Sequence, residues 1–222
     1  MKSTVNIGDR IHFLERKNMK VYFIRHGQTT CNAAGQHQGW GPIGLTEKGF
    51  DQARATKRLI EDIKFDKIYS SDLLRTRQTA EVIFKNEYHD GKIIFDEDLR
   101  EIDTGVFYKK TFNDLYPIYG DIYKQCRTDM DYGIFGGDSS KAIRTRVEHF
   151  LCRIESDVNL DCIAVVAHGG VILAAANVIL GIPSDTPIGR VPIHVSNCSV
   201  SVFGFDKNGW SVKQINYTGN LE

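Results

Sequence analysis

The sequence shows no excess of charge of either sign. Its 222 residues carry 28 Lys and Arg against 28 Asp and Glu, so the formal net charge at pH 7 is zero. Proteins that bind nucleic acid or anionic membranes usually show a basic excess, so this balance argues against both kinds of partner. The chain also has no unbroken apolar run of about 20 residues, and we therefore expect no transmembrane helix.

Closely spaced cysteine pairs are absent as well. The five cysteines stand at scattered positions, which are Cys31, Cys126, Cys152, Cys162 and Cys198. An odd, scattered set predicts neither a disulfide framework nor a zinc site, and it favours reduced thiols in a cytoplasmic protein. Residues 1–18 lack the charged-then-apolar pattern of a signal peptide. We interpret them as an N-terminal extension, with one short strand around Ile11–Leu14, ahead of a single domain at 19–222.

Short apolar runs alternate with helical patterns along the rest of the chain. Strands are predicted at 21–24, 67–70, 93–95 and 163–166, with a hairpin of strands at 199–205 and 211–215. Helices are predicted after the N-cap residues Thr46, Asp72 and Ser139, and over 171–180; the first presents Phe50, Ala53, Ile60 and Ile63 on one face. This alternation predicts an α/β fold, a three-layer α/β/α sandwich around a mostly parallel central sheet.

Polar residues suited to phosphate follow three of these strands. Arg25–Gly27 come after the first strand, Ser70–Asp72 and then Arg75 after the second, and His168–Gly170 after the fourth. In open parallel sheets, ligands bind beyond the carboxyl ends of the strands. Two of these residues are histidines, His26 and His168, which are 142 residues apart in the sequence. We expect adjacent central strands to bring them together.

Such a cluster suits phosphoryl transfer. Guanidinium groups bind phosphate oxygens in a bidentate fork, and a glycine at a helix start lets backbone N–H groups approach an anion. One imidazole can attack phosphorus, and a second, if protonated, can neutralise charge on the phosphoryl oxygens. Each residue alone has a plainer interpretation, as a packing histidine, a surface arginine or a tight turn. That interpretation weakens for the whole set, because it must account for every strand end independently.

These motifs resemble those of the histidine phosphatase superfamily, also called phosphoglycerate mutase-like. Residues 25–32 are similar to its R-H-G-x-T-x-x-N signature, residues 70–80 to S-S-x-L-x-R-A-x-Q-T-A, and residues 165–170 to V-V-S-H-G-G. Residues 45–53, 99–105 and 197–199 resemble further family segments in the same order. The resemblance extends from Val21 to about Phe205. It implies the family's α/β catalytic domain, with a small cap insertion at about 106–138.

The resemblance implies a role for each matched residue. His26 is expected to be the nucleophile that becomes phosphohistidine, and Glu101 the acid for the leaving group and then the base for water. The expected phosphate pocket consists of Arg25, Asn32, Arg75, His168 and the Gly169 amide. Gln38 and Gly39 match a family loop near the substrate. Neither a metal nor a cofactor is expected.

The choice of acid depends on context alone. Glu101 stands in a charged loop whose other carboxylates are Asp96, Glu97, Asp98 and Asp103. The plainer interpretation is that Glu101 is a surface glutamate. Only its place in the family-like segment L-R-E-I-D-x-G, residues 99–105, favours Glu101 as the acid.

Three departures from the family pattern concern the mouth of the predicted pocket. Phe107–Lys110 stand where the family often has aromatic-Glu-Gly, Asp138 stands where it usually has Glu, and residues 37–45 look lengthened. These departures leave the substrate open. The cap also carries aromatic and basic side chains that either grip a sugar or a carboxylate, or pack and face water; they are Tyr116, Tyr119, Tyr123, Lys124 and Arg127.

The leading interpretation is a phosphohydrolase that acts on a small phosphate monoester and releases inorganic phosphate. One alternative is a cofactor-dependent phosphoglycerate mutase. True mutases resemble one another in an N-E-R-x-Y-G stretch, and this chain has Arg100–Asp103 there instead, which disfavours that alternative. A second alternative is a non-catalytic phospholigand-binding protein, and the retention of every core motif residue argues against it.

Overall fold

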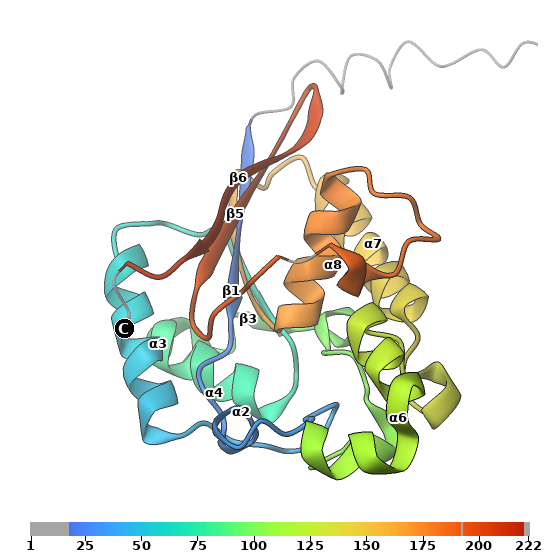
Figure 1. Cartoon of the computed structure of the whole chain (residues 1–222). Coiled ribbons are helices and arrows are strands. Elements are labelled where there is room, and N and C mark those ends of the chain that lie inside the picture. Colours follow the sequence, from blue (N-terminus) through green and yellow to red (C-terminus); the bar gives the residue numbers. More distant parts are fainter. Residues whose placement is uncertain (1–17, 192, 220–222) are drawn as a thin grey trace, which may run out of the picture.

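The computed structural model describes residues 18–191 and 193–219 (Figure 1). Residues 1–17, and with them the predicted extension and its short strand around Ile11–Leu14, lie outside the described residues. Within the described part of the chain, no helix has both the length and the apolar character needed to cross a bilayer.

Six strands form one sheet in the order β3-β2-β4-β1-β5-β6. They are β1 (Met19–Arg25), β2 (Lys67–Ser70), β3 (Ile93–Phe95), β4 (Cys162–Ala167), β5 (Val200–Asp206) and β6 (Gly209–Tyr217). The pairs β1–β4, β2–β4 and β2–β3 are parallel, whereas β5 is antiparallel to both β1 and β6. The sheet is mostly parallel with one antiparallel edge, and the predicted α/β fold and terminal hairpin are confirmed.

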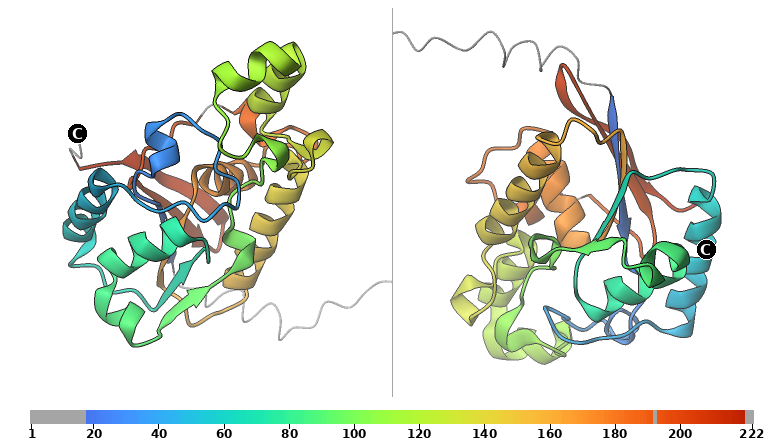
Figure 2. Two further views of the ribbon diagram at one scale, coloured as in Figure 1. Left: turned by 90° about the horizontal axis from the view of Figure 1, so that it is seen from below. Right: turned by 180° about the vertical axis from the view of Figure 1, so that it is seen from behind.

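Helices cover both faces of the sheet, as the two views in Figure 2 show. The helices are α2 (Thr30–Ala33), α3 (Glu47–Ile60), α4 (Leu74–Ile83), α5 (Lys85–His89), α6 (Phe112–Asp129), α7 (Ser140–Glu155) and α8 (Gly169–Ile179). Short 3-10 turns are η1 (Glu97–Leu99), η2 (Gly105–Phe107), η3 (Gly133–Phe135) and η4 (Ile188–Arg190). In Figure 1, α3 and α4 lie on one side of the sheet, α7 and α8 on the other, and α2 and α6 below.

The strand residues alternate between two buried clusters. On β1, Val21 and Phe23 pack with α7 and α8, while Ile24 packs with α3 and α4. On β4, Val165 and Val166 divide in the same way. Successive side chains of a strand point to opposite faces, so a strand covered on both sides is apolar throughout. The central strands β1 and β4 are therefore held rigidly between two helical layers, and their carboxyl ends are fixed in place.

Two predicted helix starts are confirmed and one is wrong. The hydroxyls of Thr46 and Ser139 each accept a backbone N–H bond of 3.1 Å at the start of α3 and α7. Asp72 does not cap α4, whose N-cap is Leu73 with no side-chain hydrogen bond. The Asp72 carboxylate instead accepts two hydrogen bonds from Arg100. A bidentate guanidinium is a stronger partner for a carboxylate than a helix N–H.

Two helix boundaries also differ from the prediction. Helix α3 ends at Ile60, so Ile63 lies after the helix, where its N–H bonds to the Ile60 carbonyl. The last helix, α8, begins at Gly169, two residues before its predicted start. That earlier start places the residues after β4 at a helix N-terminus.

Candidate active site

Two histidines meet at the ends of the neighbouring strands β1 and β4. His26 follows β1 and His168 follows β4, and the parallel register places Arg25 opposite Ala167. Both imidazoles are buried, with ring centroids 5.2 Å apart and ring planes inclined by 60°. The expectation that adjacent strands bring these two histidines together is confirmed.

The imidazole of His26 is oriented by the next peptide group. Its Nδ1 lies 2.8 Å from the carbonyl oxygen of Gly27. A carbonyl oxygen can only accept, so Nδ1 carries the proton and Nε2 keeps its lone pair. Burial, together with the Arg75 and Arg25 guanidiniums, lowers the pKa of His26 well below its usual value. A neutral imidazole with its lone pair on Nε2 is the form that can attack phosphorus.

Loop carbonyls hold the two arginines of the cluster. Arg75, in the first turn of α4, is fully buried. Its Nη2 donates to the Gly39 carbonyl at 3.0 Å and its Nη1 to that of Gly41 at 3.4 Å. Arg25 donates from Nη1 to the Val195 carbonyl at 2.5 Å. Burial lowers the pKa of Arg75 to about 10, which still leaves the guanidinium charged at neutral pH.

Three buried nitrogens of this cluster have no hydrogen-bond partner among the described residues. They are Nε of Arg25, Nε of Arg75 and Nδ1 of His168. Leaving a buried polar group unpaired costs about 1–3 kcal/mol, so native proteins seldom tolerate it without a reason. Guanidinium and imidazole nitrogens are the groups that proteins use to bind phosphate oxygens. The cluster is therefore chemically matched to a phosphate group.

The Glu101 carboxylate contacts the N-terminus of α8, the helix that begins directly after His168. Its Oε2 accepts the Gly170 N–H at 3.3 Å, and its Oε1 accepts the Ile102 N–H at 3.0 Å. A Cβ on Gly170 would come within 2.3 Å of Glu101 Oε1, so only glycine permits this approach. The Glu101 backbone carbonyl accepts the Trp40 indole N–H at 2.7 Å. Both ends of Glu101 are thus held next to the phosphate cluster.

The rival carboxylates are engaged elsewhere. Asp96 and Asp98 form ion pairs with Arg153. Glu97 pairs with Arg100, and Asp103 accepts the backbone N–H of the second residue after it. Of these five loop carboxylates, Glu101 is the one that the structure brings to the N-terminus of α8.

The family model of the histidine phosphatase superfamily (branch 1) matches residues 21–218. The chain belongs to this superfamily. The adenosylcobalamin/alpha-ribazole phosphatase of Salmonella typhimurium is 30% identical over 69% of the chain and 76% of that protein. A probable phosphoglycerate mutase of Salmonella paratyphi A is 31% identical over 86% of the chain and 87% of that protein. The alpha-ribazole phosphatase of Shigella flexneri shares the fold at 24% identity, with a TM-score of 0.79 over 90% of the chain and 97% of that structure.

Three of the predicted site residues support the cluster in this histidine phosphatase. Asn32 Oδ1 accepts the Thr29 N–H at 3.1 Å and the Asn197 amide at 3.3 Å, which leaves its NH2 group as the part that can reach phosphate. Gln38 accepts the Thr29 hydroxyl at 2.8 Å. Gly39 has φ of +47° and supplies a carbonyl to Arg75. Gln38 and Gly39 therefore shape the loop that holds an arginine.

Gly169 is the first residue of α8, so its N–H has no partner within the helix. A Cβ at this position would lie 3.6 Å from Arg25 Nε. The Gly169 backbone is therefore beside the Arg25 guanidinium, at the end of a helix that favours anions.

The contacts that Ser71, Arg146 and Asp138 make around the candidate site were not predicted from the sequence. The Ser71 hydroxyl lies 3.0 Å from His168 Nε2. Arg146 on α7 donates to the Arg100 carbonyl at 2.7 Å and to the Asp138 carboxylate at 2.7 Å. Ser71 stands inside a quoted motif and could have been found there. Asp138 was noted only as a departure from the family pattern. Arg146 has no local signal, because its partners Arg100 and Asp138 come from other segments of the chain.

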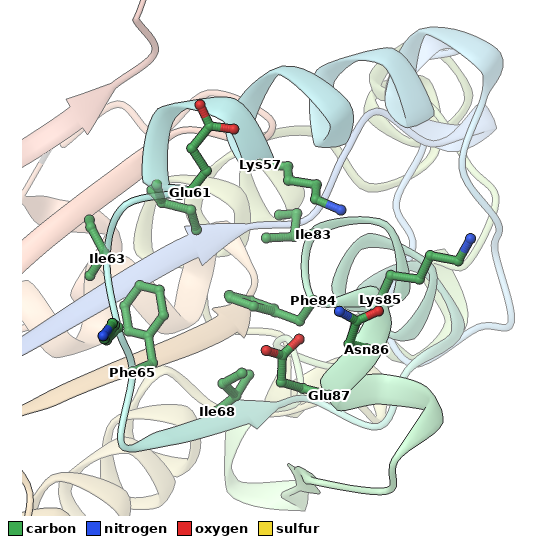
Figure 3. A pocket seen from close by; sticks show the side chains of 12 residues that line it. Lys57, Glu61, Ile63, Phe65, Ile68, Ile83, Phe84, Lys85, Asn86 and Glu87 are labelled. Atoms are coloured by element: carbon green, nitrogen blue, oxygen red, sulfur yellow. The ribbon is translucent and has the colours of Figure 1, made fainter.

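A separate pocket lies away from the histidines, between the end of α3, the start of β2 and α5 (Figure 3). Phe65, Phe84 and Ile68 line it together with charged side chains such as Glu87. This pocket lies near the amino end of β2, opposite the end that carries Ser71.

Among the described residues, no group of three or more His, Cys, Asp or Glu side chains is placed to hold a metal ion.

Proposed function

We propose that this histidine phosphatase removes phosphate from a small phosphorylated metabolite through a phosphohistidine on His26. The observation that carries the proposal is the buried histidine pair, with unpaired nitrogens of two arginines around it. The phosphatase name of the relative from Salmonella typhimurium supports the same reaction class. The free cysteines support a cytoplasmic location, where thiols stay reduced.

The first step is transfer of the phosphoryl group to the enzyme. Nε2 of His26 attacks phosphorus as the bond to the leaving oxygen breaks, and Glu101 gives that oxygen a proton. Arg25 and Arg75 neutralise charge on the phosphoryl oxygens. His168 is neutral in the free protein, because burial and nearby cations lower its pKa. A bound phosphate dianion favours its protonation, so His168 becomes a further donor to phosphate.

The second step returns the enzyme to its starting state. Glu101, now a carboxylate, takes a proton from a water molecule that attacks the phosphohistidine. The N–P bond breaks, inorganic phosphate leaves, and Nε2 regains its lone pair. One carboxyl group serves both steps, because each step leaves it in the protonation state that the next requires.

The mutase alternative requires the phosphohistidine to pass its phosphate to a second substrate instead of water. The mutase alternative is considered because some relatives are named as probable phosphoglycerate mutases. The absence of the N-E-R-x-Y-G stretch argues against it. A phosphoglycerate isomerisation assay, run beside a phosphate-release assay, separates the two functions.

The decisive experiment is to trap the intermediate. Radiolabelled substrate should leave a label on the wild-type protein that survives alkali and is lost in acid, as expected of phosphohistidine. His26→Ala should abolish both the label and turnover, whereas His89→Ala, at an exposed histidine, should change neither. Phosphate binding without any label or turnover would instead support the non-catalytic alternative.

We also expect turnover without a metal. The arginines supply the charge that magnesium supplies in many phosphoryl-transfer enzymes. Treatment with EDTA should leave p-nitrophenyl phosphate hydrolysis unchanged. Loss of activity that magnesium restores would show that this expectation is wrong.

A further inference from the structure

The turn from Gln38 to Gly41 supports the guanidinium of Arg75. The Gly41 N–H closes the turn by donating to the Gln38 carbonyl at 3.0 Å. The carbonyls of Gly39 and Gly41 accept the two hydrogen bonds from Arg75. Trp40 stands between these two carbonyls in the sequence. The main chain on either side of Trp40 therefore fixes a guanidinium whose Nε has no partner among the described residues.

The same turn packs against the segment that carries Glu101. A Cβ on Gly39 would lie 2.7 Å from Asp103 Oδ1. A Cβ on Gly41 would come within 2.0 Å of the Tyr108 ring. Both glycines therefore allow an approach that a larger residue would prevent. Because the two segments are in such close contact, a shift of the turn displaces the segment with the proposed acid.

The side chain of Trp40 completes this connection. Its indole N–H donates to the Glu101 carbonyl at 2.7 Å, and Arg146 Nη2 donates to the same oxygen at 3.4 Å. The guanidinium carbons of Arg100 and Arg146 lie 5.0 and 5.8 Å from the centre of the indole ring, within the range of cation–π attraction. The Trp40 residue is still 41% exposed. Its replacement therefore opens no buried cavity and tests the hydrogen bond itself.

Arg75 and Glu101 also act on each other through charge. Burial is the main cause of the lowered pKa of Arg75, and the Glu101 carboxylate opposes that lowering. The carboxylate has the same effect on the pKa of Arg25, which burial also lowers. The proposed acid and the two guanidiniums therefore lie within electrostatic reach of one another, and a displacement of one changes the field at the others.

We propose that Trp40 is a positioning residue that couples the phosphate site at Arg75 to the acid Glu101. The inference rests on the proposed phosphatase function and adds a residue to it. The indole N–H holds the Glu101 main chain so that the carboxyl group reaches the leaving oxygen, while the neighbouring carbonyls hold Arg75 on the phosphate. Trp40 acts through these two residues, and no bond to it forms or breaks.

The chain offers a matched control, because its other tryptophan makes an equivalent hydrogen bond away from the site. The Trp210 indole N–H donates to a carboxylate on α7. Trp210 pairs with Phe205, and Phe205 pairs with Met19 at the start of β1. It therefore lies at the end of β1 opposite His26. Trp40→Phe and Trp210→Phe each remove one indole N–H and keep an aromatic ring, but the first alone removes a bond to the acid.

Rapid-quench measurement of phosphoenzyme formation gives the first test. Trp40→Phe should slow phosphoryl transfer from an alkyl phosphate about tenfold, the loss expected for one hydrogen bond. Transfer from p-nitrophenyl phosphate should slow far less, because p-nitrophenolate leaves without a proton. In a Glu101→Gln background, Trp40→Phe should cause no further loss, since no acid is left to position. Trp210→Phe should leave transfer from both esters unchanged.

Tryptophan emission gives the second test, which needs no turnover. In Trp210→Phe, Trp40 is the one tryptophan of the chain. Its emission should change when inorganic phosphate is added, and the change should saturate at the concentrations that inhibit hydrolysis. The wild type should respond in the same way. Trp40→Phe, in which Trp210 alone emits, should show no response.

Three results would overturn the inference. They are equal slowing of both esters by Trp40→Phe, a further loss from Trp40→Phe in the Glu101→Gln background, and Trp40 emission that is unchanged at saturating phosphate. Each leaves the proposed function standing as long as the wild type forms labelled phosphoenzyme. Absence of a label from either ester in the wild type would instead contradict the proposed function, and the emission test would still decide whether the phosphate site and Trp40 are linked.

Discussion

His26 and His168 lie close enough, with ring centroids 5.2 Å apart, that a proton on one ring disfavours a proton on the other. Burial is the largest cause of the lowered pKa of each ring, and Arg75 is the next. In the proposed reaction, the pair therefore starts as two neutral imidazoles, and binding of a phosphate dianion is expected to favour protonation of His168.

The first prediction concerns the titration of this pair. In the free protein, both imidazoles should titrate well below pH 6.5, the ordinary value for histidine. Arg75→Ala should move both titrations to higher pH, because it removes a nearby positive charge. NMR titration of the imidazole Cε1 protons measures this directly. Titration of both rings near pH 6.5 in the wild type would contradict the buried geometry.

The second prediction separates the acid from the nucleophile. p-Nitrophenolate leaves as a stable anion, whereas an alkoxide needs a proton from Glu101. Glu101→Gln should therefore slow phosphoryl transfer from an alkyl phosphate about 100-fold or more, and from p-nitrophenyl phosphate far less. The variant should also accumulate labelled phosphoenzyme from the aryl ester, since it lacks the base for water. Equal slowing of both esters, with no intermediate trapped, would place the acid elsewhere.

The third prediction concerns the choice of arginine. Phosphate and vanadate should inhibit competitively, and Arg75→Ala should weaken this inhibition about tenfold or more. Arg77→Ala should leave it unchanged. Arg77 donates to the Asp72 carbonyl at 2.7 Å, and its guanidinium lies 3.8 Å from the centre of the Phe95 ring, so it is engaged away from the histidines. Inhibition constants for the two variants decide the matter, and equal effects would refute the assignment.

The fourth prediction is that Arg146 positions the proposed acid without touching the substrate. It donates to the Arg100 carbonyl and to Asp138, which in turn accepts the Asp103 N–H at 3.0 Å. Arg146→Met should reproduce the leaving-group dependence of Glu101→Gln in weaker form. Combining both substitutions should add little to Glu101→Gln alone, because coupled residues are not additive. Fully additive losses would indicate a general structural defect instead.

The fifth prediction concerns stability against acid. His37 lies 2.7 Å from the Tyr123 hydroxyl, and burial followed by the charge of Arg127 lowers its pKa from 6.5 to about 4. Between these pH values the unfolded chain binds a proton at His37 and the folded chain does not. The free energy of unfolding should therefore fall as the pH drops through this window, by up to about 1.4 kcal/mol per pH unit from this group.

Urea denaturation of the wild type and of His37→Gln measures this contribution. The substitution removes the titrating group, so the wild-type advantage should be largest above pH 6.5 and should shrink toward pH 4. A difference that stays constant with pH would show that His37 is not held neutral in the folded protein.

Local sequence determined the strands, most helices and the Arg25–Gly27 motif that contains His26. Strand β2 runs from Lys67 to Ser70, as its apolar run predicts, and the N-caps Thr46 and Ser139 are confirmed. Such features depend on residues a few positions apart, so the pattern alone contains the information. Asp72 shows the limit of this reasoning. The local pattern predicts that its carboxylate caps a helix, but the carboxylate instead accepts a hydrogen bond from Arg100, which is distant in the sequence.

Only the tertiary structure decided how the site is assembled. It placed Glu101, among five loop carboxylates, at the N-terminus of α8, and it made Arg146 the support of that loop. It also brought Lys124 and Arg127 to a cavity beside α8, where the sequence left them as either binding or solvated groups. These arrangements depend on contacts between segments far apart in the chain. Their geometry is set by how the helices pack on the sheet, and no local pattern records it.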